Sequence, residues 1–348
     1  MKIALFLPNW IGDVVMATPA IRAVRERYPT SEIVGVCKPY VADVVAGSPW
    51  FDRIVPLDSK GPMRGHWPAV AWNLRSWRPD VSILYANTFR SALVAWLARS
   101  GRRIGFVRHG RALMLTTALH GRVDSTGRLV PSPAIDDYNR LAVAADTPDP
   151  GHRMQLFTTP TDETAADRIL EGFGFRSNRE LICLNPGAAF GASKHWSVES
   201  FARLTQELID ERGAQILVLC GPSERDMARQ IVRLAGRPMT ASLADASVSL
   251  GLTKALVRRS TLLITTDSGP RHFAAAFDRP VVTLFGPTHI AWTETYFAKA
   301  IHLQKKVPCG PCQKRVCPLD HRCMTELSPD EVFAAACQLL EANQRVAS

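Results

Sequence analysis

The sequence predicts an α/β protein built from two Rossmann-like domains, and three observations support that prediction. Apolar runs of strand length alternate with amphipathic segments of helix length. Turns that contain Gly or Pro separate them, and the alternation starts again near residue 181 after an interruption at 146–152 (DTPDPGH). Strands that alternate with helices form parallel sheets with right-handed crossovers. The 348 residues, 46% of them hydrophobic, suffice for two cores of ordinary size.

The first domain is predicted from five apolar runs and three helical segments. The first run leads through a turn with Pro8 and Gly12 into a helix, and a helix also follows the second and fourth runs. The predicted strands are 3–7, 33–37, 53–57, 81–85 and 104–106, and the predicted helices are 13–27, 40–46 and 91–99.

The second domain repeats this order. Its predicted strands are 181–184, 215–219, 262–265 and 281–285, and its predicted helices are 198–211 and 224–234. We place the boundary between residues 146 and 179, which gives domains 1–160 and 161–348. Open α/β sheets bind ligands beyond the carboxyl ends of their strands. We therefore expect the segments that follow strands, at 9–13, 185–194, 221–224 and 267–272, to converge on one cleft between the domains.

Composition narrows the classes of partner. The formal net charge of +10 favours an anionic partner, such as nucleic acid, anionic lipid or a phosphorylated substrate. Nucleic acid is disfavoured because no recognised motif is present and the aromatic residues are not interleaved with basic ones. No apolar run approaches the roughly 20 residues that span a bilayer. Pro8, Asn9 and Asp13 interrupt the apolar start, which predicts a strand rather than a signal peptide and hence a cytoplasmic protein.

The segment 265–287 is the most informative part of the chain. Asp267, Ser268 and Gly269 form a polar turn where a helix begins, and His272 follows one helical turn later. A helix N-terminus presents unpaired N–H groups and a partial positive charge, so this turn suits a phosphate or a ribose. The alternative is that Asp267 and Ser268 only cap the helix.

Three further segments carry candidate residues. Asp13, after Gly12, has the position of a general base, although an acid in a first helical turn is also favoured by the helix dipole. The loop 185–196 is long, rich in small residues and contains Lys194. Because long loops without a function are uncommon, this composition favours a diphosphate-binding loop over a simple connection with a surface lysine. Glu224 follows a strand and suits ribose hydroxyls, or it is a helix-terminal acid without a ligand.

These segments together resemble glycosyltransferase family 9, most of all its type II ADP-heptose:lipopolysaccharide heptosyltransferases. The matching segments are 8–16 (PNWIGDVVM), 87–93 (NTFRSAL), 186–196 (PGAAFGASKHW), 267–276 (DSGPRHFAAA) and 279–287 (RPVVTLFGP). The resemblance implies the GT-B fold, with an N-terminal acceptor-binding domain, a C-terminal nucleotide-sugar-binding domain and an active-site cleft between them. It also implies transfer of heptose from ADP-heptose to the heptosyl-Kdo-lipid A inner core, at the cytoplasmic face of the inner membrane.

The resemblance assigns roles to individual residues. It implies that Asp13 is the base of a single inverting displacement that needs no metal, and that Gly12 and Arg90 face the acceptor. The donor residues that it implies are Lys194 and Glu224 and the turn residues Asp267, Ser268, Gly269 and His272. Basic residues also crowd the end of the first domain, and we expect part of this group to bind acceptor phosphates and the membrane surface: Arg90, Arg99, Arg102, Arg103, Arg108 and Arg111.

Four cysteines near the C-terminus have spacing typical of a zinc site. Cys309, Cys312, Cys317 and Cys323 follow the pattern C-x2-C-x4-C-x5-C, although the longer gaps match no known zinc ribbon or finger. Similar cysteine-rich tails occur in some members of the resembled family and not in others. The sequence therefore leaves a structural metal, disulfides and free thiols open, and catalysis should not depend on any of them.

Rival functions make different demands on the sequence. An NAD-dependent oxidoreductase requires G-x-G-x-x-G after the first strand, where this chain has Pro8 to Asp13 instead. A non-catalytic nucleotide-sugar-binding protein does not need both Asp13 and Lys194. The nearest alternative is another family 9 enzyme with a different donor or acceptor, for example a type I heptosyltransferase, because Pro270 and Arg271 depart from the turn of other members.

Overall fold

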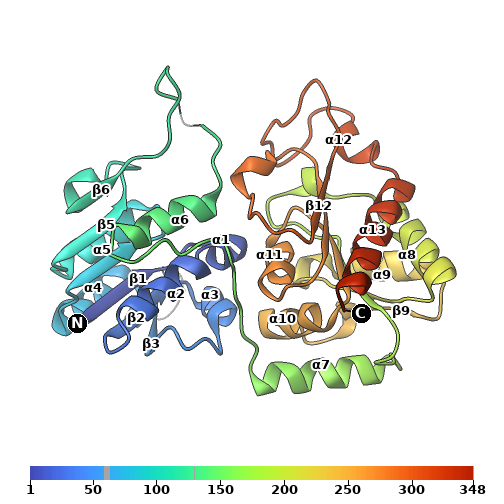
Figure 1. Cartoon of the computed structure of the whole chain (residues 1–348), viewed down its shortest axis with the longest axis horizontal. Coiled ribbons are helices and arrows are strands. Elements are labelled where there is room, and N and C mark those ends of the chain that lie inside the picture. Colours follow the sequence, from blue (N-terminus) through green and yellow to red (C-terminus); the bar gives the residue numbers. More distant parts are fainter. Residues whose placement is uncertain (59–62, 129, 348) are drawn as a thin grey trace. The chain divides into compact units, whose positions relative to one another are not determined.

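The computed structural model describes residues 1–58, 63–128 and 130–347, and these form two compact units (Figure 1). Unit 1 comprises residues 1–157 together with 291–296, and unit 2 comprises residues 158–290 together with 297–348. The chain thus passes into unit 2 after Phe157, three residues before the boundary placed from the sequence. The return of residues 291–296 to unit 1 was not expected from the sequence.

Unit 1 contains a six-stranded parallel sheet in the order β3-β2-β1-β4-β5-β6. Its strands are β1 (Lys2–Phe6), β2 (Glu32–Cys37), β3 (Arg53–Pro56), β4 (Val81–Leu84), β5 (Arg102–Phe106) and β6 (Thr117–Leu119). Its helices are α1 (Ile11–Met16), α2 (Thr18–Arg27), α3 (Pro39–Val45), α4 (Trp67–Trp77), α5 (Phe89–Leu97) and α6 (Ala134–Val143), with 3₁₀ turns η1 (Met63–Gly65) and η2 (Ala112–Met114).

Unit 2 contains a second six-stranded parallel sheet in the order β12-β11-β10-β7-β8-β9. Its strands are β7 (Leu181–Asn185), β8 (Gln215–Val218), β9 (Thr240–Ser242), β10 (Leu262–Thr266), β11 (Val281–Phe285) and β12 (Ala300–Gln304). Its helices are α7 (Pro160–Gly172), α8 (Val198–Arg212), α9 (Arg225–Ala235), α10 (Leu250–Arg259), α11 (Gly269–Ala276), α12 (Arg322–Thr325) and α13 (Pro329–Ala347). Its 3₁₀ turns are η3 (Ala192–Lys194), η4 (Pro222–Glu224) and η5 (Leu243–Asp245), and η6 (Ile290–Trp292) lies where the chain leaves for unit 1.

The two sheets have the same topology, which confirms the predicted pair of Rossmann-like folds. Counted within each unit, both follow the strand order 3-2-1-4-5-6. The order reverses between β1 and β4 in unit 1 and between β7 and β10 in unit 2. The central strands are buried on both faces, which explains their continuous apolar runs. Each reversal point is where a doubly wound sheet binds its ligand.

Local sequence explains where the structure differs from the predicted elements. The predicted helix 13–27 is two helices, because Pro19 lies in the first turn of α2 and lacks the N–H that would continue α1. The edge strands β6, β9 and β12 were not predicted from the sequence. They have no fully buried residue, so their sequences lack the apolar run of a central strand.

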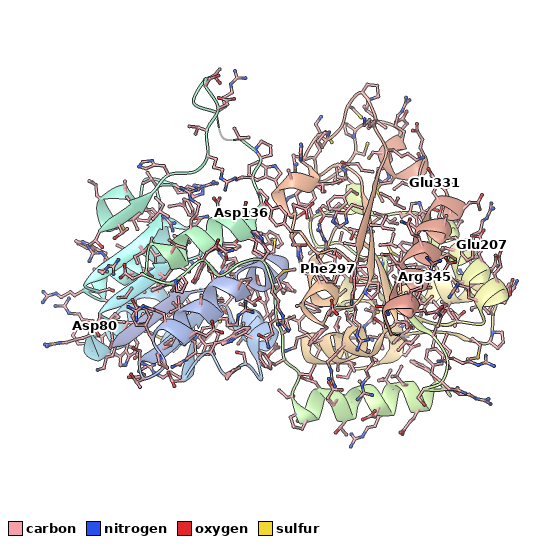
Figure 2. All side chains as sticks on the ribbon, viewed as in Figure 1. Asp80, Asp136, Glu207, Phe297, Glu331 and Arg345 are labelled. Atoms are coloured by element: carbon pink, nitrogen blue, oxygen red, sulfur yellow. The ribbon has the colours of Figure 1, made fainter. Side chains whose placement is uncertain are left out.

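Residues 291–296 are attached to unit 1 through Asp136 of α6, which is labelled in Figure 2. The Tyr296 hydroxyl donates to Asp136 Oδ2 over 3.1 Å, and His152 Nε2 lies 2.9 Å from Oδ1 of the same carboxylate. The rings of His152 and Tyr296 also pack with centroids 4.3 Å apart. Polar contacts of this kind leave little trace in the sequence pattern, so the return of the chain was not foreseen.

Candidate functional site

At the reversal point of unit 2, Asn185, the last residue of β7, makes hydrogen bonds to β10 and to the turn that follows it. Its Nδ2 donates to Thr265 Oγ1 over 3.0 Å and to Ser268 Oγ over 2.9 Å. Thr266 of β10 donates through Oγ1 to the Gly187 carbonyl over 2.8 Å. These bonds join the loop after β7 to the turn after β10, as expected for the carboxyl ends of neighbouring parallel strands.

Lys194 and Asp267 form a buried ion pair at this point. Lys194 Nζ lies 2.5 Å from Asp267 Oδ2 and 2.9 Å from the Asp267 carbonyl oxygen. Their side chains are only 9% and 6% exposed, and Thr288 Oγ1 donates to the same Oδ2 over 2.7 Å. The structure therefore brings together two residues that are 73 positions apart in the sequence.

Asp267 remains ionised despite its burial. Burial alone would raise the pKa of this carboxyl, but the nearby charges of Lys194 and Arg271 hold the pKa below its ordinary value. Arg271 is itself buried, with Nη1 3.4 Å from Asp267 Oδ1 and its guanidinium over the Phe285 ring at 5.0 Å. The two cations and one carboxylate leave a net positive charge beside the first turn of α11.

The first turn of α11 carries no side-chain cap. Ser268 occupies the N-cap position, but its side chain makes no capping hydrogen bond and instead meets Asn185 and Thr265. Gly269 is the first residue of the helix and Pro270 is the second. The alternative in which Asp267 and Ser268 serve only to cap α11 does not describe this turn, because Asp267 is engaged by Lys194.

His272 lies on the buried side of α11, with 3% of its surface exposed. Burial, and next the charge of Arg271, hold its pKa well below the ordinary value, so the imidazole is neutral at pH 7. Its Nδ1 has no hydrogen-bond partner among the described residues. A neutral ring supplies no charge to a phosphate, which limits His272 to a hydrogen-bonding or packing role.

Glu224 lies against the loop that follows β7. Its Oε2 accepts a hydrogen bond from the Gly221 N–H over 2.6 Å. A Cβ atom added to Gly187 would lie 2.5 Å from Glu224 Cδ, so a larger residue here would displace this carboxylate. The structure thus brings Glu224 close to the loop that begins at Asn185, and this loop also bears Lys194.

The reversal point of unit 1 contains Asp13, in the first turn of α1 directly after Gly12. Burial raises the pKa of Asp13 to about 6, and a hydrogen bond with the Tyr138 side chain opposes that rise. Tyr138 comes from α6, and its ring packs edge-on against Tyr85 at a centroid distance of 6.0 Å. Trp10, the residue before α1, is 53% exposed.

The arginines grouped from the sequence do not form one solvent-exposed patch. Arg111 is fully buried and donates to backbone carbonyls of Phe106 and Ala86 over 2.9 and 2.6 Å. Arg102 pairs with Asp146 over 2.5 Å, and Arg103 donates to the Met114 carbonyl over 2.6 Å. Arg111 thus satisfies carbonyls at the carboxyl ends of β5 and β4, whereas Arg102 and Arg103 are held by Asp146 and by the carbonyl of the 3₁₀ turn η2. Arg90, in the first turn of α5, is exposed as expected.

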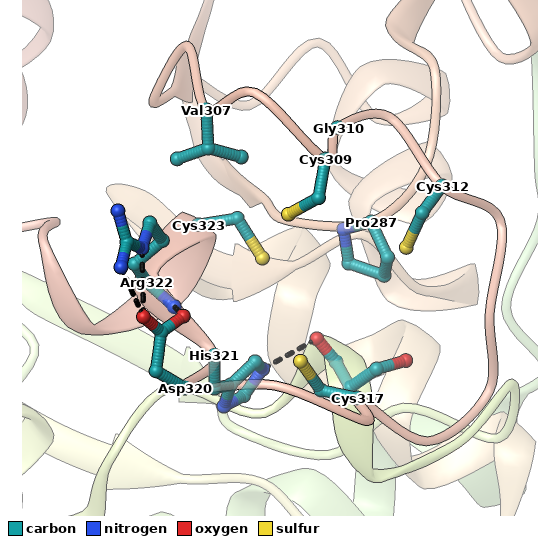
Figure 3. A pocket seen from close by; sticks show the side chains of 11 residues that line it. Pro287, Val307, Cys309, Gly310, Cys312, Cys317, Asp320, His321, Arg322 and Cys323 are labelled. Carbon is teal, nitrogen blue, oxygen red and sulfur yellow. Dashed lines mark hydrogen bonds and ion pairs between the residues drawn. The ribbon is translucent and has the colours of Figure 1, made fainter.

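The four C-terminal cysteines line one small cavity in unit 2 (Figure 3). Burial raises the pKa of the Cys323 thiol to about 11, and the other three thiols add to the rise. Within residues 1–58, 63–128 and 130–347, no three His, Cys, Asp or Glu side chains are arranged as the ligands of a metal ion.

None of the helices in the same residues is both long enough and apolar enough to cross a bilayer.

Several residues of these sites, Asn185 and Tyr138 among them, were not singled out as site residues from the sequence. Asn185 ends an apolar run with an amide, and this break in the pattern was a usable signal. Tyr138 is 125 positions from Asp13 and lies on an ordinary amphipathic helix, so the sequence offered no signal for it. Only the packing of α6 against α1 brings it to the carboxyl.

Comparison with known proteins adds a family to this geometry. The model of glycosyltransferase family 9 (heptosyltransferase) matches residues 67–322. The chain is 27% identical to lipopolysaccharide heptosyltransferase 2 of Salmonella typhimurium over 306 residues, 86% of this chain and 87% of the relative.

Two solved structures resemble the chain over nearly its whole length. The ADP-heptose lipopolysaccharide heptosyltransferase II of E. coli has a TM-score of 0.79 at 25% identity, covering 99% of this chain and 100% of that one. The family 9 glycosyltransferase of Veillonella parvula has a TM-score of 0.81 at 22% identity, covering 98% and 97%. The two sheets are those of the GT-B fold. Because the family model covers well over half of its residues, the chain belongs to glycosyltransferase family 9 and is a glycosyltransferase.

Proposed function

We propose that this glycosyltransferase transfers heptose from ADP-heptose to the heptosyl-Kdo-lipid A inner core of lipopolysaccharide. The observation that carries the proposal is the similarity to heptosyltransferases 2 over almost the whole chain, at 86–99% coverage. The buried cationic turn in unit 2 and the perturbed carboxyl in unit 1 supply the two kinds of chemistry that this transfer needs.

The donor diphosphate binds, in this proposal, at the first turn of α11. The Lys194 ammonium has three N–H donors, and two of them are used by Asp267, through its carbonyl oxygen and its Oδ2. The remaining donor, with the uncapped start of α11 at Ser268 and Gly269, is suited to a phosphate oxygen. Glu224 is suited to accept from the ribose hydroxyls. His272 is neutral and supports the turn from within.

The transfer itself is a single displacement with inversion. The acceptor hydroxyl forms a bond to the anomeric carbon as the bond from that carbon to the ADP oxygen breaks. Asp13 takes the hydroxyl proton, and its pKa of about 6 keeps it ionised at pH 7 and more basic than an ordinary aspartate. The charge that develops on ADP is stabilised by Lys194 and the α11 N-terminus, so no metal is required for this step.

The acceptor is anionic because it carries phosphates and Kdo carboxylates, and Arg90 on α5 is the exposed cation that we assign to it. Gly12 allows the acceptor to approach the backbone beside Asp13. A net charge of +10 favours attraction to an anionic membrane surface, and we therefore propose a peripheral location at the cytoplasmic face of the inner membrane.

Mass spectrometry of a reconstituted reaction tests the proposal. Purified protein is incubated with ADP-heptose and either Kdo-lipid A or its monoheptosylated form. We expect a gain of one heptose on the monoheptosylated acceptor only. A gain on Kdo-lipid A instead indicates a type I enzyme. No product with either acceptor, while ADP still raises the melting temperature, refutes the proposed substrates and leaves a nucleotide-binding relative.

A further inference from the structure

The loop between β12 and α12 is unusual for its length and lack of regular structure. It runs from residue 305 to 321, seventeen residues without a helix or strand, and all of them are described. Loops of more than about 12–15 residues without secondary structure are uncommon and are usually functional when ordered. The conformation of this loop therefore depends on interactions other than the hydrogen bonds of a helix or a sheet.

Four thiols of this segment point into the same small cavity, of about 20 Å³ (Figure 3). Cys309 and Cys312 come from the first turn of the loop, Cys317 from its second half and Cys323 from α12. Val307 and Pro287 complete an apolar wall around them. A cavity of this size accommodates one water-sized sphere, which is also the scale of a single ion.

The loop also holds the segment that bears Lys194. Ser193 donates through its N–H to the Arg315 carbonyl over 3.1 Å and through Oγ to the Lys314 carbonyl over 2.6 Å. The Ser193 carbonyl in turn accepts from His321 Nε2 over 2.7 Å, so this nitrogen carries the proton. A Cβ on Gly191 would lie 2.4 Å from the Arg315 oxygen, which shows how closely the two segments pack.

We propose that Cys309, Cys312, Cys317 and Cys323 bind one thiolate-preferring divalent ion, with Zn²⁺ the best fit, and that this ion braces the loop under Lys194. Four cysteine ligands with no open position are typical of a structural zinc site. His321 is excluded as a ligand through Nε2 because that atom is engaged by Ser193.

Binding requires local adjustment of the thiols. The described side chains do not form a metal-ligand set, so metal binding in this proposal requires the four thiols to move closer together. Thiols that are protonated lose their protons to water as the metal–sulfur bonds form, without any change of oxidation state. In this proposal the metal takes no part in the reaction and acts by fixing the loop.

Metal analysis of untagged protein is the first test, with a matched pair of variants. The double variant Cys312→Ser/Cys317→Ser removes two ligands, and Cys337→Ser removes a partly buried thiol of α13 outside the cavity. We expect about one equivalent of zinc in the wild type and in Cys337→Ser, and less than about a tenth in the double variant. We also expect removal of the metal to lower the melting temperature by about 5–10 °C.

Cobalt substitution of the wild type keeps the test decisive if the double variant fails to fold. Thiolate-to-cobalt charge-transfer absorption, saturating at one equivalent of Co²⁺ and lost on addition of Zn²⁺, supports the site. Absence of zinc in the purified protein together with absence of the cobalt spectrum overturns it. Fewer than eight titratable thiols in denatured, unreduced protein also overturns it, in favour of disulfides.

The effect on Lys194 rests on the proposed function and has its own readout. We expect ADP to bind more weakly to metal-free protein, since the loop that positions Ser193 and Lys194 is released. Bound zinc without heptosyl transfer leaves the metal site standing and refutes only the proposed reaction. Bound zinc whose removal leaves ADP affinity unchanged refutes the bracing role.

Discussion

The two reversal points of the molecule differ in how their charged groups are held. In unit 2, Asp267 accepts bonds from Lys194 and Thr288, and its pKa is held low. In unit 1, burial dominates over the bond from Tyr138 and raises the pKa of Asp13 to about 6. A carboxylate satisfied by cations organises a binding site, whereas a carboxylate kept short of partners is a stronger base. The same topology thus provides a site that binds charge in unit 2 and a site that accepts a proton in unit 1.

The largest expected effect is loss of the base. Asp13→Asn keeps the size of the side chain and its contact with Tyr138 but cannot accept the proton. We expect kcat to fall by about 10²–10⁴-fold. ADP affinity, measured by calorimetry, should stay within about twofold of the wild type, because Asp13 lies in unit 1. Wild-type turnover in this variant contradicts the assignment.

Breaking the buried ion pair should affect both stability and donor binding. Lys194→Met removes the shorter of the two ion pairs to Asp267 and leaves Arg271, 3.4 Å away, as its cation, so we expect a loss of about 1–3 kcal/mol in the free energy of unfolding. Urea unfolding measures this loss, and ADP titration measures the weaker binding.

The double variant Lys194→Met/Asp267→Asn is the control for that change. The second change removes the carboxylate that faces Arg271, so we expect the double variant to be no more stable than Lys194→Met, with ADP binding still weak. ADP binding near the wild-type level in the double variant would show that Lys194 does not contact the donor.

A methyl group at Gly187 should disturb Glu224 because the two are in contact. Gly187→Ala places a Cβ 2.5 Å from Glu224 Cδ, and we expect about 1–3 kcal/mol of destabilisation with weaker ADP binding. Gly172→Ala at the end of α7 meets nothing within 4 Å and should stabilise by about 0.5–1 kcal/mol. Thermal unfolding compares the two, and equal effects would argue against crowding at Glu224.

Because the pKa of Asp13 is raised, replacing this residue should stabilise the protein by an amount that depends on pH. The pKa rises from its ordinary 3.8 to about 6 in the folded protein, so ionisation of this carboxyl opposes folding and the wild type loses stability as pH rises from about 4 to 6. Asp13→Asn should therefore be more stable than the wild type at pH 8, by about 1–3 kcal/mol, with the advantage gone near pH 4. A pH-independent difference would exclude titration of Asp13 as its source.

The smallest effect is expected at the surface. Arg90→Ala should raise the KM for the acceptor a few-fold and leave the KM for ADP-heptose and the melting temperature unchanged. Arg168→Ala, at an exposed position of α7 in unit 2, should change neither KM. A rise in the donor KM at Arg90→Ala would move this residue out of the acceptor site.

The sequence by itself determined the fold class and most of its central elements. Strands such as β1, β7, β10 and β11 are buried on both faces, so each appears as an unbroken apolar run. The turn at Asp267 and the loop with Lys194 were also recognisable, because small and polar residues directly follow those runs.

Only the tertiary structure decided the contacts that give these residues their chemistry. The edge strands β6, β9 and β12, the return of residues 291–296 to unit 1 and the burial of Arg111 depend on neighbours far along the chain. The pairing of Lys194 with Asp267, and of Tyr138 with Asp13, likewise joins segments 73 and 125 positions apart. The hydrophobic periodicity of a segment indicates how that segment packs against the core. A pKa or an ion pair depends instead on which groups from distant segments lie next to one another.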